Sequence, residues 1–298
     1  MKPKFTCCFL IAICAIYLSS CQKDFVPENV PIAVDSTNVP GLPGDSIYLD
    51  KIYYLENANI PDTTSITSLA YDANKRVISL LDSGNMAVGQ TYVESYKYFY
   101  IGNNARPYKY FHVSGYTNTS VSDTATTYIF YDSQGRKLKD SSVFFNLNGL
   151  SYEEYRYSYV PGFIYVQSFA GTSNGNFSPY YRDTAKTDTR GNVISNRRYS
   201  YFNGNYDLMF TSSYSYDNKR EPFSVLSLHP AHFNIPWWET GYLDYSGYNN
   251  MLSQNEEYGN SNIDIVFTYT YNTLGLPIKR SGTYNGITEG LIFKYKSL

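Results

Sequence analysis

Hydrophobic and polar residues alternate along most of the chain. In the stretch 263–271, IDIVFTYTY, every second residue is isoleucine, phenylalanine or tyrosine, and most residues between them are polar. The stretch 153–159, EEYRYSY, puts its tyrosines on one face in the same way. Because successive side chains of a β-strand point to opposite faces, this period of two predicts antiparallel strands with one aromatic and one hydrophilic face.

A strand–turn–strand pattern recurs along the chain, and residues 127–138, TYIFYDSQGRKL, are its clearest copy. The residue before the turn returns every 26 to 31 residues, which indicates a repeat architecture. Two strands per copy predict about sixteen strands. The residues before the eight turns are Tyr71, Tyr100, Tyr131, Tyr159, Thr187, Tyr216, Tyr245 and Tyr271.

The turn residues explain why the chain reverses at these points. In the clearest copy, Asp132 can accept hydrogen bonds from the amides that follow it. Gly135 permits the positive φ that closes a four-residue connection. Most copies have an apolar residue three positions after this glycine or its equivalent, and we expect that residue to re-enter the core. These apolar residues are Ile78, Leu138, Ile194, Phe223, Leu252 and Ile278.

The predicted fold is all-β, a single domain over residues 45–298 whose antiparallel meander forms a closed or nearly closed β-barrel. Sheets this wide seldom stay open, and closure removes exposed edges. We expect the aromatic face inside and the hydrophilic face outside. The alternative is an outer-membrane pore with the faces reversed. It is disfavoured because tyrosine runs along whole strands and is not confined to two girdles.

Two resemblances rest on these repeats. YDSQGRKL, YDANKRVI and TDTRGNVI resemble the YD repeat of Rhs-type bacterial proteins. YSYDNKREPF, with YNN at 248–250 and then YTYNTLGLPIK, is more similar to a family of Bacteroidetes lipoproteins of unknown function. That resemblance covers residues 48–298 and implies a porin-like β fold with no established activity. Rhs proteins enclose a toxin with many more repeats, so an encapsulating role is disfavoured.

The start of the chain predicts export. Lys2 and Lys4 precede an uncharged apolar run over residues 5–18, which is too short to cross a bilayer as a helix. This pattern is typical of a signal peptide, here residues 1–20. The run ends in LSSC, which resembles the lipobox of bacterial lipoproteins and implies cleavage before Cys21 and acylation of that cysteine. The alternative, a transmembrane anchor with a chance cysteine, is disfavoured by the length.

Residues 21–44 are predicted to be a lipidated N-terminus and a proline-rich tether. The tripeptide at 22–24, QKD, resembles the acidic signal that sends some Bacteroidetes lipoproteins to the exterior face of the outer membrane. All four cysteines lie in the predicted signal peptide or at its cleavage site, so the mature chain is expected to have no disulfide and no cysteine nucleophile. The net charge of −2 shows no excess of lysine and arginine of the kind that indicates nucleic-acid binding.

The sequence has no catalytic motif, no cofactor-binding fingerprint and no pattern of metal ligands. Glu153 and Glu154 are adjacent, as are Glu256 and Glu257, so each pair points to opposite faces of a strand and cannot form facing carboxylates. We expect both pairs to mark solvated strand ends. His112 is expected to be a structural or surface residue.

The repeat is interrupted at residues 226–241, LSLHPAHFNIPWWETG. His229 and His232 flank Pro230, which favours loop histidines over a metal site. Trp237 and Trp238 could form a platform for sugar rings or a partner, or could plug one end of the barrel. These four residues are the candidate binding site.

The sequence therefore predicts a lipid-anchored outer-membrane protein with a binding or scaffolding role. Its expected partners are the membrane, through the lipid, and a glycan or an envelope protein, without nucleic acid or a cofactor. The alternatives are a cell-surface hydrolase acting on glycans and an outer-membrane pore.

Overall fold

The computed structural model describes residues 47–56, 63–85, 91–116, 122–146, 149–173, 175–222, 248–259, 261–284 and 286–298. In these ranges the chain forms sixteen β-strands, and no helix there is long and apolar enough to cross a membrane. The strands are β1 (Ile47–Leu55), β2 (Thr63–Tyr71), β3 (Val77–Asn85), β4 (Thr91–Phe99), β5 (Lys109–Tyr116), β6 (Ser122–Tyr131), β7 (Lys137–Asn146), β8 (Gly149–Val160), β9 (Phe163–Ser173), β10 (Asn176–Thr187), β11 (Val193–Phe202), β12 (Asn205–Arg220), β13 (Asn249–Tyr258), β14 (Ser261–Tyr271), β15 (Pro277–Tyr284) and β16 (Ile287–Ser297).

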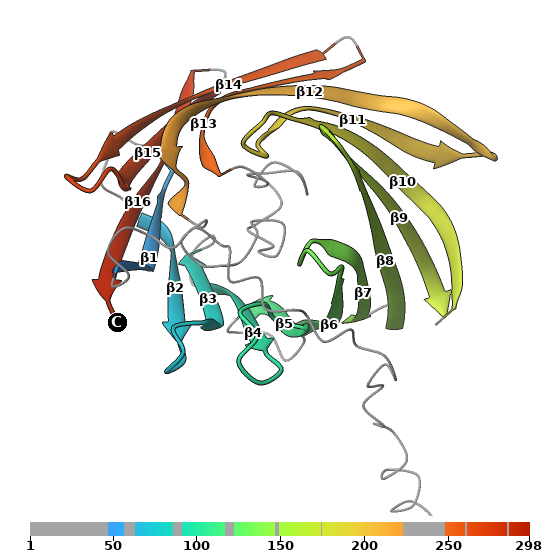
Figure 1. Cartoon of the computed structure of the whole chain (residues 1–298), viewed down its shortest axis with the longest axis horizontal. Coiled ribbons are helices and arrows are strands. Elements are labelled where there is room, and N and C mark those ends of the chain that lie inside the picture. The colour runs from blue at the N-terminus through green and yellow to red at the C-terminus, as the bar shows by residue number, and fades with distance from the viewer. Residues whose placement is uncertain are drawn as a thin grey trace, which may run out of the picture. The chain divides into compact units, whose positions relative to one another are not determined.

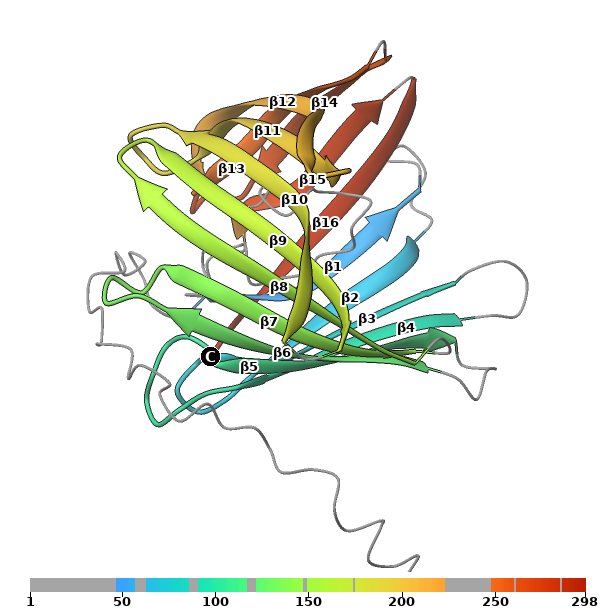
Figure 2. The same ribbon diagram turned by 90° about the vertical axis from the view of Figure 1, so that its right-hand side faces the viewer.

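Every strand pairs antiparallel with the next, and β1 pairs with β16, so the sheet closes into a barrel (Figure 1). At the closing seam Ile52 lies opposite Phe293, and both side chains are buried. The strands run obliquely across the wall, as closure requires (Figure 2). The predicted all-β meander and its closed barrel are confirmed.

The inner and outer walls alternate with the predicted period of two, but the outer wall is not the hydrophilic face that was expected, because exposed Phe145, Leu150 and Phe163 lie on it. On β14, Phe267 is 8% exposed and points inward, whereas the adjacent Val266 is 57% exposed. Buried apolar and aromatic side chains form two clusters on the inner wall, one on β1–β4 with β16 and one on β9–β12. The inner wall of β5–β8, between the two clusters, is more polar.

Each regular turn is held by the carboxylate or amide that begins it. Asp72 Oδ1 accepts hydrogen bonds from the backbone N–H groups of Asn74 and Arg76, both at 2.9 Å, and its Oδ2 accepts one from Arg76 Nε at 2.7 Å. Asp132 makes the same bonds, including one from Arg136 Nε at 2.7 Å. The motif residues are therefore committed to turn geometry.

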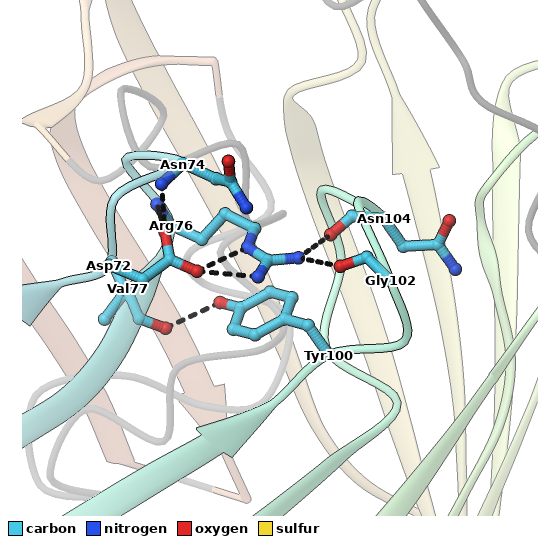
Figure 3. A network of polar contacts seen from close by, with 7 residues as sticks. All are labelled: Asp72, Asn74, Arg76, Val77, Tyr100, Gly102 and Asn104. Carbon is cyan, nitrogen blue, oxygen red and sulfur yellow. Dashed lines mark hydrogen bonds and ion pairs between the residues drawn. The ribbon is translucent and has the colours of Figure 1, made fainter.

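The turns are also joined to one another (Figure 3). The Arg76 guanidinium donates to the carbonyls of Gly102 at 2.7 Å and Asn104 at 3.0 Å, and it lies 4.4 Å from the centre of the Tyr100 ring. The Tyr100 hydroxyl donates to the carbonyl of Val77 at 2.6 Å. Such a bond contributes about 0.5–1.5 kcal/mol. Equivalent bonds join Tyr131 to Pro107, Tyr216 to Val193 and Tyr295 to Pro277.

The fourth turn position has the left-handed backbone that the sequence predicts. Gly135 has a φ of 71°, and Gly191 and Gly275 have similar values. Lys75 occupies this position in the first copy with a φ of 63°. An L-residue in this conformation is strained by roughly 1–2 kcal/mol, so the first turn keeps its shape through the Asp72 and Arg76 contacts.

In the copies that the structure describes, the apolar residue after the turn does not re-enter the core, so that prediction is wrong there. Phe223 lies outside the described residues. Tyr131 pairs with Lys137 and Phe130 pairs with Lys139, which leaves Leu138 as the extra residue of a β-bulge. Leu138 is 43% exposed on the outer wall, and the preceding Lys137 is 6% exposed on the inner wall. A bulge adds one residue to the strand and so moves the expected position to the other face. The same extra position is held by Ile78, Ile194, Leu252 and Ile278.

The turn predicted after Tyr216 does not close a hairpin, because β12 continues to Arg220 with an irregular register. Asp217 Oδ1 still accepts a hydrogen bond from the Lys219 N–H at 2.8 Å, as in the regular turns. Asp217 also accepts hydrogen bonds from the backbone N–H of Asn250 and from the Tyr271 hydroxyl, which join β12 to β13 and β14. In the copy expected after Tyr245, residues 245–247 lie outside the described residues.

We predict that Gly135→Ala destabilises the barrel more than Gly275→Ala. Both substitutions place a Cβ at positive φ, which costs about 1–2 kcal/mol. At Gly135 the added Cβ would also lie 1.7 Å from an Arg106 terminal nitrogen, whereas nothing lies within 4 Å at Gly275. Displacing Arg106 from the Tyr131 ring should cost roughly 0.5–1 kcal/mol more. Urea unfolding measures both variants, and equal losses would contradict the assigned contact.

Candidate binding site on the inner wall

A polar patch lies on the inner wall because strand pairing aligns inward positions of β5–β8. Thr127 lies opposite Ser142, and Asp140 lies opposite Tyr155. The wall is hollowed here by a cavity of about 160 Å³. Its lining combines aromatic rings with ionisable groups, among them Tyr110, His112, Asp140, Glu153, Tyr155 and Tyr157.

Lys137 and Asp140 form a buried ion pair at one side of the cavity. Lys137 Nζ lies 2.6 Å from Asp140 Oδ2, and the Tyr157 hydroxyl donates to the same oxygen at 2.8 Å. Burial, together with the nearby Asp140 charge, raises the pKa of Tyr157, so this hydroxyl remains a donor at neutral pH. A buried charge is costly unless it is paired and hydrogen-bonded. These contacts satisfy Asp140 Oδ2, whereas Asp140 Oδ1 is buried without a hydrogen-bond partner among the described residues.

Glu153 is the second carboxyl group of the cavity. It points inward from β8, and the Tyr155 hydroxyl donates to its Oε2 at 3.2 Å. Burial raises the pKa of Glu153. This carboxyl group is therefore more readily protonated than an exposed glutamate.

Asp140 and Glu153 lie on neighbouring strands and face the same cavity. Asp140 lies opposite Tyr155, so Glu153 is its diagonal neighbour, with about 7–8 Å between the backbone positions of the two residues. One carboxylate is paired with a lysine, and the pKa of the other is raised. Two carboxyl groups in such different environments can serve as a proton donor and an ionised partner.

A second cluster of ionisable groups lies next to the cavity on β3–β5. Asp82 lies directly opposite Glu94, and both are buried. His112 Nε2 lies 2.7 Å from Glu94 Oε1, and the Tyr96 hydroxyl donates to the same oxygen at 2.5 Å. Burial raises the pKa of Glu94, but His112 and Tyr96 outweigh it and lower the pKa overall. Burial and the Glu94 charge raise the pKa of Asp82.

Most of the candidate site residues predicted from the sequence are not among the described residues that line this cavity. Cys21, His229, His232, Trp237 and Trp238 lie outside the described residues, so their roles stay predictions. His112 lines the inner wall, where its ring stacks on Tyr96 with a centroid distance of 4.4 Å.

The prediction for the two glutamate pairs is half right. Glu153 lines the inner cavity and Glu154 contacts Arg156 and Lys139 on the outer wall, so the pair does point to opposite faces. The pair is not a solvated strand end, because it lies within β8 and Glu154 is 6% exposed. Glu256 and Glu257 do lie near the end of β13.

Sequence reasoning did not select Lys137, Asp140 or Glu153. A usable signal was present for Glu153, which stands two residues before Tyr155 and so shares the aromatic face. Lys137 and Asp140 were hidden by the bulge at Leu138, which shifts the alternation. In the described ranges no group of three or more histidine, cysteine, aspartate or glutamate side chains could hold a metal ion.

No family model and no curated protein matches the chain. Its structure is similar to a porin-like protein from Bacteroides vulgatus ATCC 8482, with a TM-score of 0.52 and 14% identity over 84% of this chain and 99% of the other. A porin-like protein from Bacteroides uniformis ATCC 8492 is similar with a TM-score of 0.50 and 12% identity over 83% of this chain and 98% of the other. At such identities the likeness shows a shared barrel fold.

We predict that Asp82→Asn stabilises the protein at pH 7, raising Tm by about 2–4 °C. Because the native pKa of Asp82 is raised, the native state binds more protons than the unfolded state between the two pKa values, and stability falls as pH rises through that interval. Asp82→Asn removes the charge and with it this loss of stability. The gain in Tm should therefore vanish at acidic pH, where Asp82 is protonated.

Glu94→Gln is the matched control for this experiment. The Glu94 carboxylate is stabilised by His112 and Tyr96, so its neutralisation should lower Tm at pH 7. Thermal unfolding followed by circular dichroism across pH measures both variants. A gain in Tm for Asp82→Asn that persists at low pH would show that ionisation of buried Asp82 is not the cause.

Proposed function

We propose that the protein is anchored to the outer membrane by acylation of Cys21 and that its barrel binds a neutral sugar unit on the inner wall. The observation that carries the binding role is the cavity on β5–β8, which combines the Tyr110, Tyr155 and Tyr157 rings with the carboxyl groups of Asp140 and Glu153. Aromatic surface with a few oriented polar groups is typical of small-molecule sites.

The size and charge of the cavity define the ligand class. Its volume of about 160 Å³ is below the range of roughly 300–1,000 Å³ that encloses a whole drug-sized molecule, so it fits one ring-sized unit of a longer chain. Carboxylates accept hydrogen bonds from hydroxyl groups and repel anions. Neutral or amino sugars therefore suit this site better than acidic sugars.

A glycan hydrolase is the second candidate. The supporting observation is that Asp140 and Glu153 face one cavity as diagonal neighbours with different environments. Their backbone positions are about 7–8 Å apart, which allows the two carboxyl groups to reach the separation of catalytic pairs, roughly 5–9.5 Å. Under this proposal Glu153 donates the proton to the leaving oxygen and Asp140 is the ionised partner.

The pore is the less favoured alternative. The outer wall has Arg156 and Arg182 within strands β8 and β10, where lipid would lie in a spanning barrel. A cation on the lipid face costs about 2–4 kcal/mol at the bilayer midplane. This cost supports a barrel that stands in water beside the membrane and depends on the lipid for attachment.

The binding role is tested with neutral oligosaccharides on a glycan array, followed by titration calorimetry on the strongest hit. Glu153→Gln and Tyr155→Ala should each weaken binding about tenfold or more, because each removes a cavity contact. Glu257→Gln, an exposed position on β13, is the matched control and should bind normally. If no neutral glycan binds, or if the control loses as much, the inner-wall site is wrong.

The same glycans separate binding from hydrolysis. Release of new reducing ends by the native protein, which Glu153→Gln abolishes even at glycan concentrations that saturate its weakened binding, would identify the hydrolase. Binding without release would leave the protein as a glycan-binding module.

We predict that Cys21→Ala moves the protein from the membrane fraction to the soluble fraction, because acylation of Cys21 is the proposed attachment. Cell fractionation and immunoblotting measure this change. Cys14→Ala is the control, since Cys14 lies inside the proposed signal. Retention of the Cys21→Ala protein in the membrane would contradict the lipid anchor and favour an embedded barrel.

A further inference from the structure

The outer wall of β4–β11 is strongly basic. Its outward positions have seven lysines and arginines and, among the described residues, one carboxylate, Glu154. The whole chain has a net charge of −2, so composition alone does not explain this excess. The basic strip consists of Lys97, Lys109, Lys139, Arg156, Arg182, Lys186 and Arg197.

The single carboxylate is already paired. Glu154 Oε1 lies 2.6 Å from Arg156 Nε, and its Oε2 lies 3.3 Å from Lys139 Nζ. Lys139 and Arg156 lie directly opposite each other across β7 and β8, which is an unfavourable pairing of like charges. One negative charge between two cations leaves the strip with a positive excess.

Aromatic rings hold the cations in place. Lys109 Nζ lies 5.2 Å from the Phe99 ring centre and 5.5 Å from that of Tyr128. Arg156 lies 4.4 Å from the Phe169 ring centre. Cations held on aromatic faces lose less freedom when they bind an anion than cations on free side chains.

The order of the cations follows the hydrogen-bonding direction of the sheet. Arg156 lies opposite Gln167, which lies opposite Arg182, so Lys139, Arg156 and Arg182 belong to one row across β7–β10. Neighbouring strands are about 4.8 Å apart, so cations recur along the row at about 5 and 10 Å. The row runs round the convex outside of the barrel.

We propose that the basic strip binds a carboxylated polysaccharide that follows this row round the barrel. A flat bilayer touches a convex wall only along a narrow line, whereas a chain can follow the row. Arg156 and Arg182 present planar guanidinium forks, which match carboxylates. Within the row, arginines cover the faces of Phe169 and Tyr206 at 4.4 and 4.6 Å, so these two rings are not free to stack on the bases of a single-stranded nucleic acid.

This surface differs from the inner-wall site in position and charge. The inner wall presents Asp82, Glu94, Asp140 and Glu153, which repel the anions that the strip attracts. Loss of one interaction therefore leaves the other measurable.

The test measures binding of the full-length protein in neutral detergent to polygalacturonate at low salt, with dextran as the uncharged probe. Lys109→Gln with Arg182→Gln removes two strip cations that have no carboxylate within ion-pair distance in the described part of the chain. We expect this double variant to bind polygalacturonate about tenfold more weakly and with a shallower salt dependence.

Lys51→Gln with Lys294→Gln is the matched control, because it removes the same charge from paired positions on β1 and β16 outside the strip. The control should change binding less than about twofold. The proposal is overturned if native protein does not bind polygalacturonate, or if the control weakens binding as much as the strip variant. It is also overturned if single-stranded DNA or vesicles of anionic phospholipid bind more tightly and the strip variant abolishes that binding.

Discussion

Strand register is the constraint on which the rest of this barrel depends. The side chains of a strand alternate with a period of two, so a shift of one residue exchanges the inner and outer walls. Leu138 shows how this shift is controlled, because its bulge places Lys137 inside and Lys139 outside within three residues. Because of that single extra residue, Lys137 lines the cavity and Lys139 belongs to the basic strip.

The architecture was predictable because its signals are local. The alternation over 263–271 and the Asp132 to Gly135 turn report strand faces and turn conformation from adjacent residues alone. The position of Leu138 was not predictable in this way, because a bulge depends on how two strands pair. The prediction of a hairpin turn after Tyr216 was wrong for a similar reason. The role of Asp217 depends on its contacts with Asn250 and Tyr271, which lie on other strands.

The candidate site was harder to predict than the fold. Lys137, Asp140 and Glu153 are spread over two strands and become neighbours only through pairing. Their residue types are common on strands, and no motif marks them. The sequence directs attention to Trp237 and Trp238 because they interrupt the repeat, whereas the cavity described here lies within regular repeats. A repeat can therefore carry specific chemistry on inward positions that its motif leaves unspecified.

The tyrosine bonds between turns have a consequence for how such a barrel changes in size. The hairpins β2–β3, β6–β7, β10–β11 and β14–β15 each contain their own bulge. The Tyr100 hydroxyl joins the hairpin β4–β5 to the carbonyl of Val77 in the hairpin before it. A unit that corrects its own register and attaches to its neighbour by one repeated contact can be duplicated or deleted whole. Gene duplication could thus widen or narrow the barrel two strands at a time while every remaining side chain keeps its face.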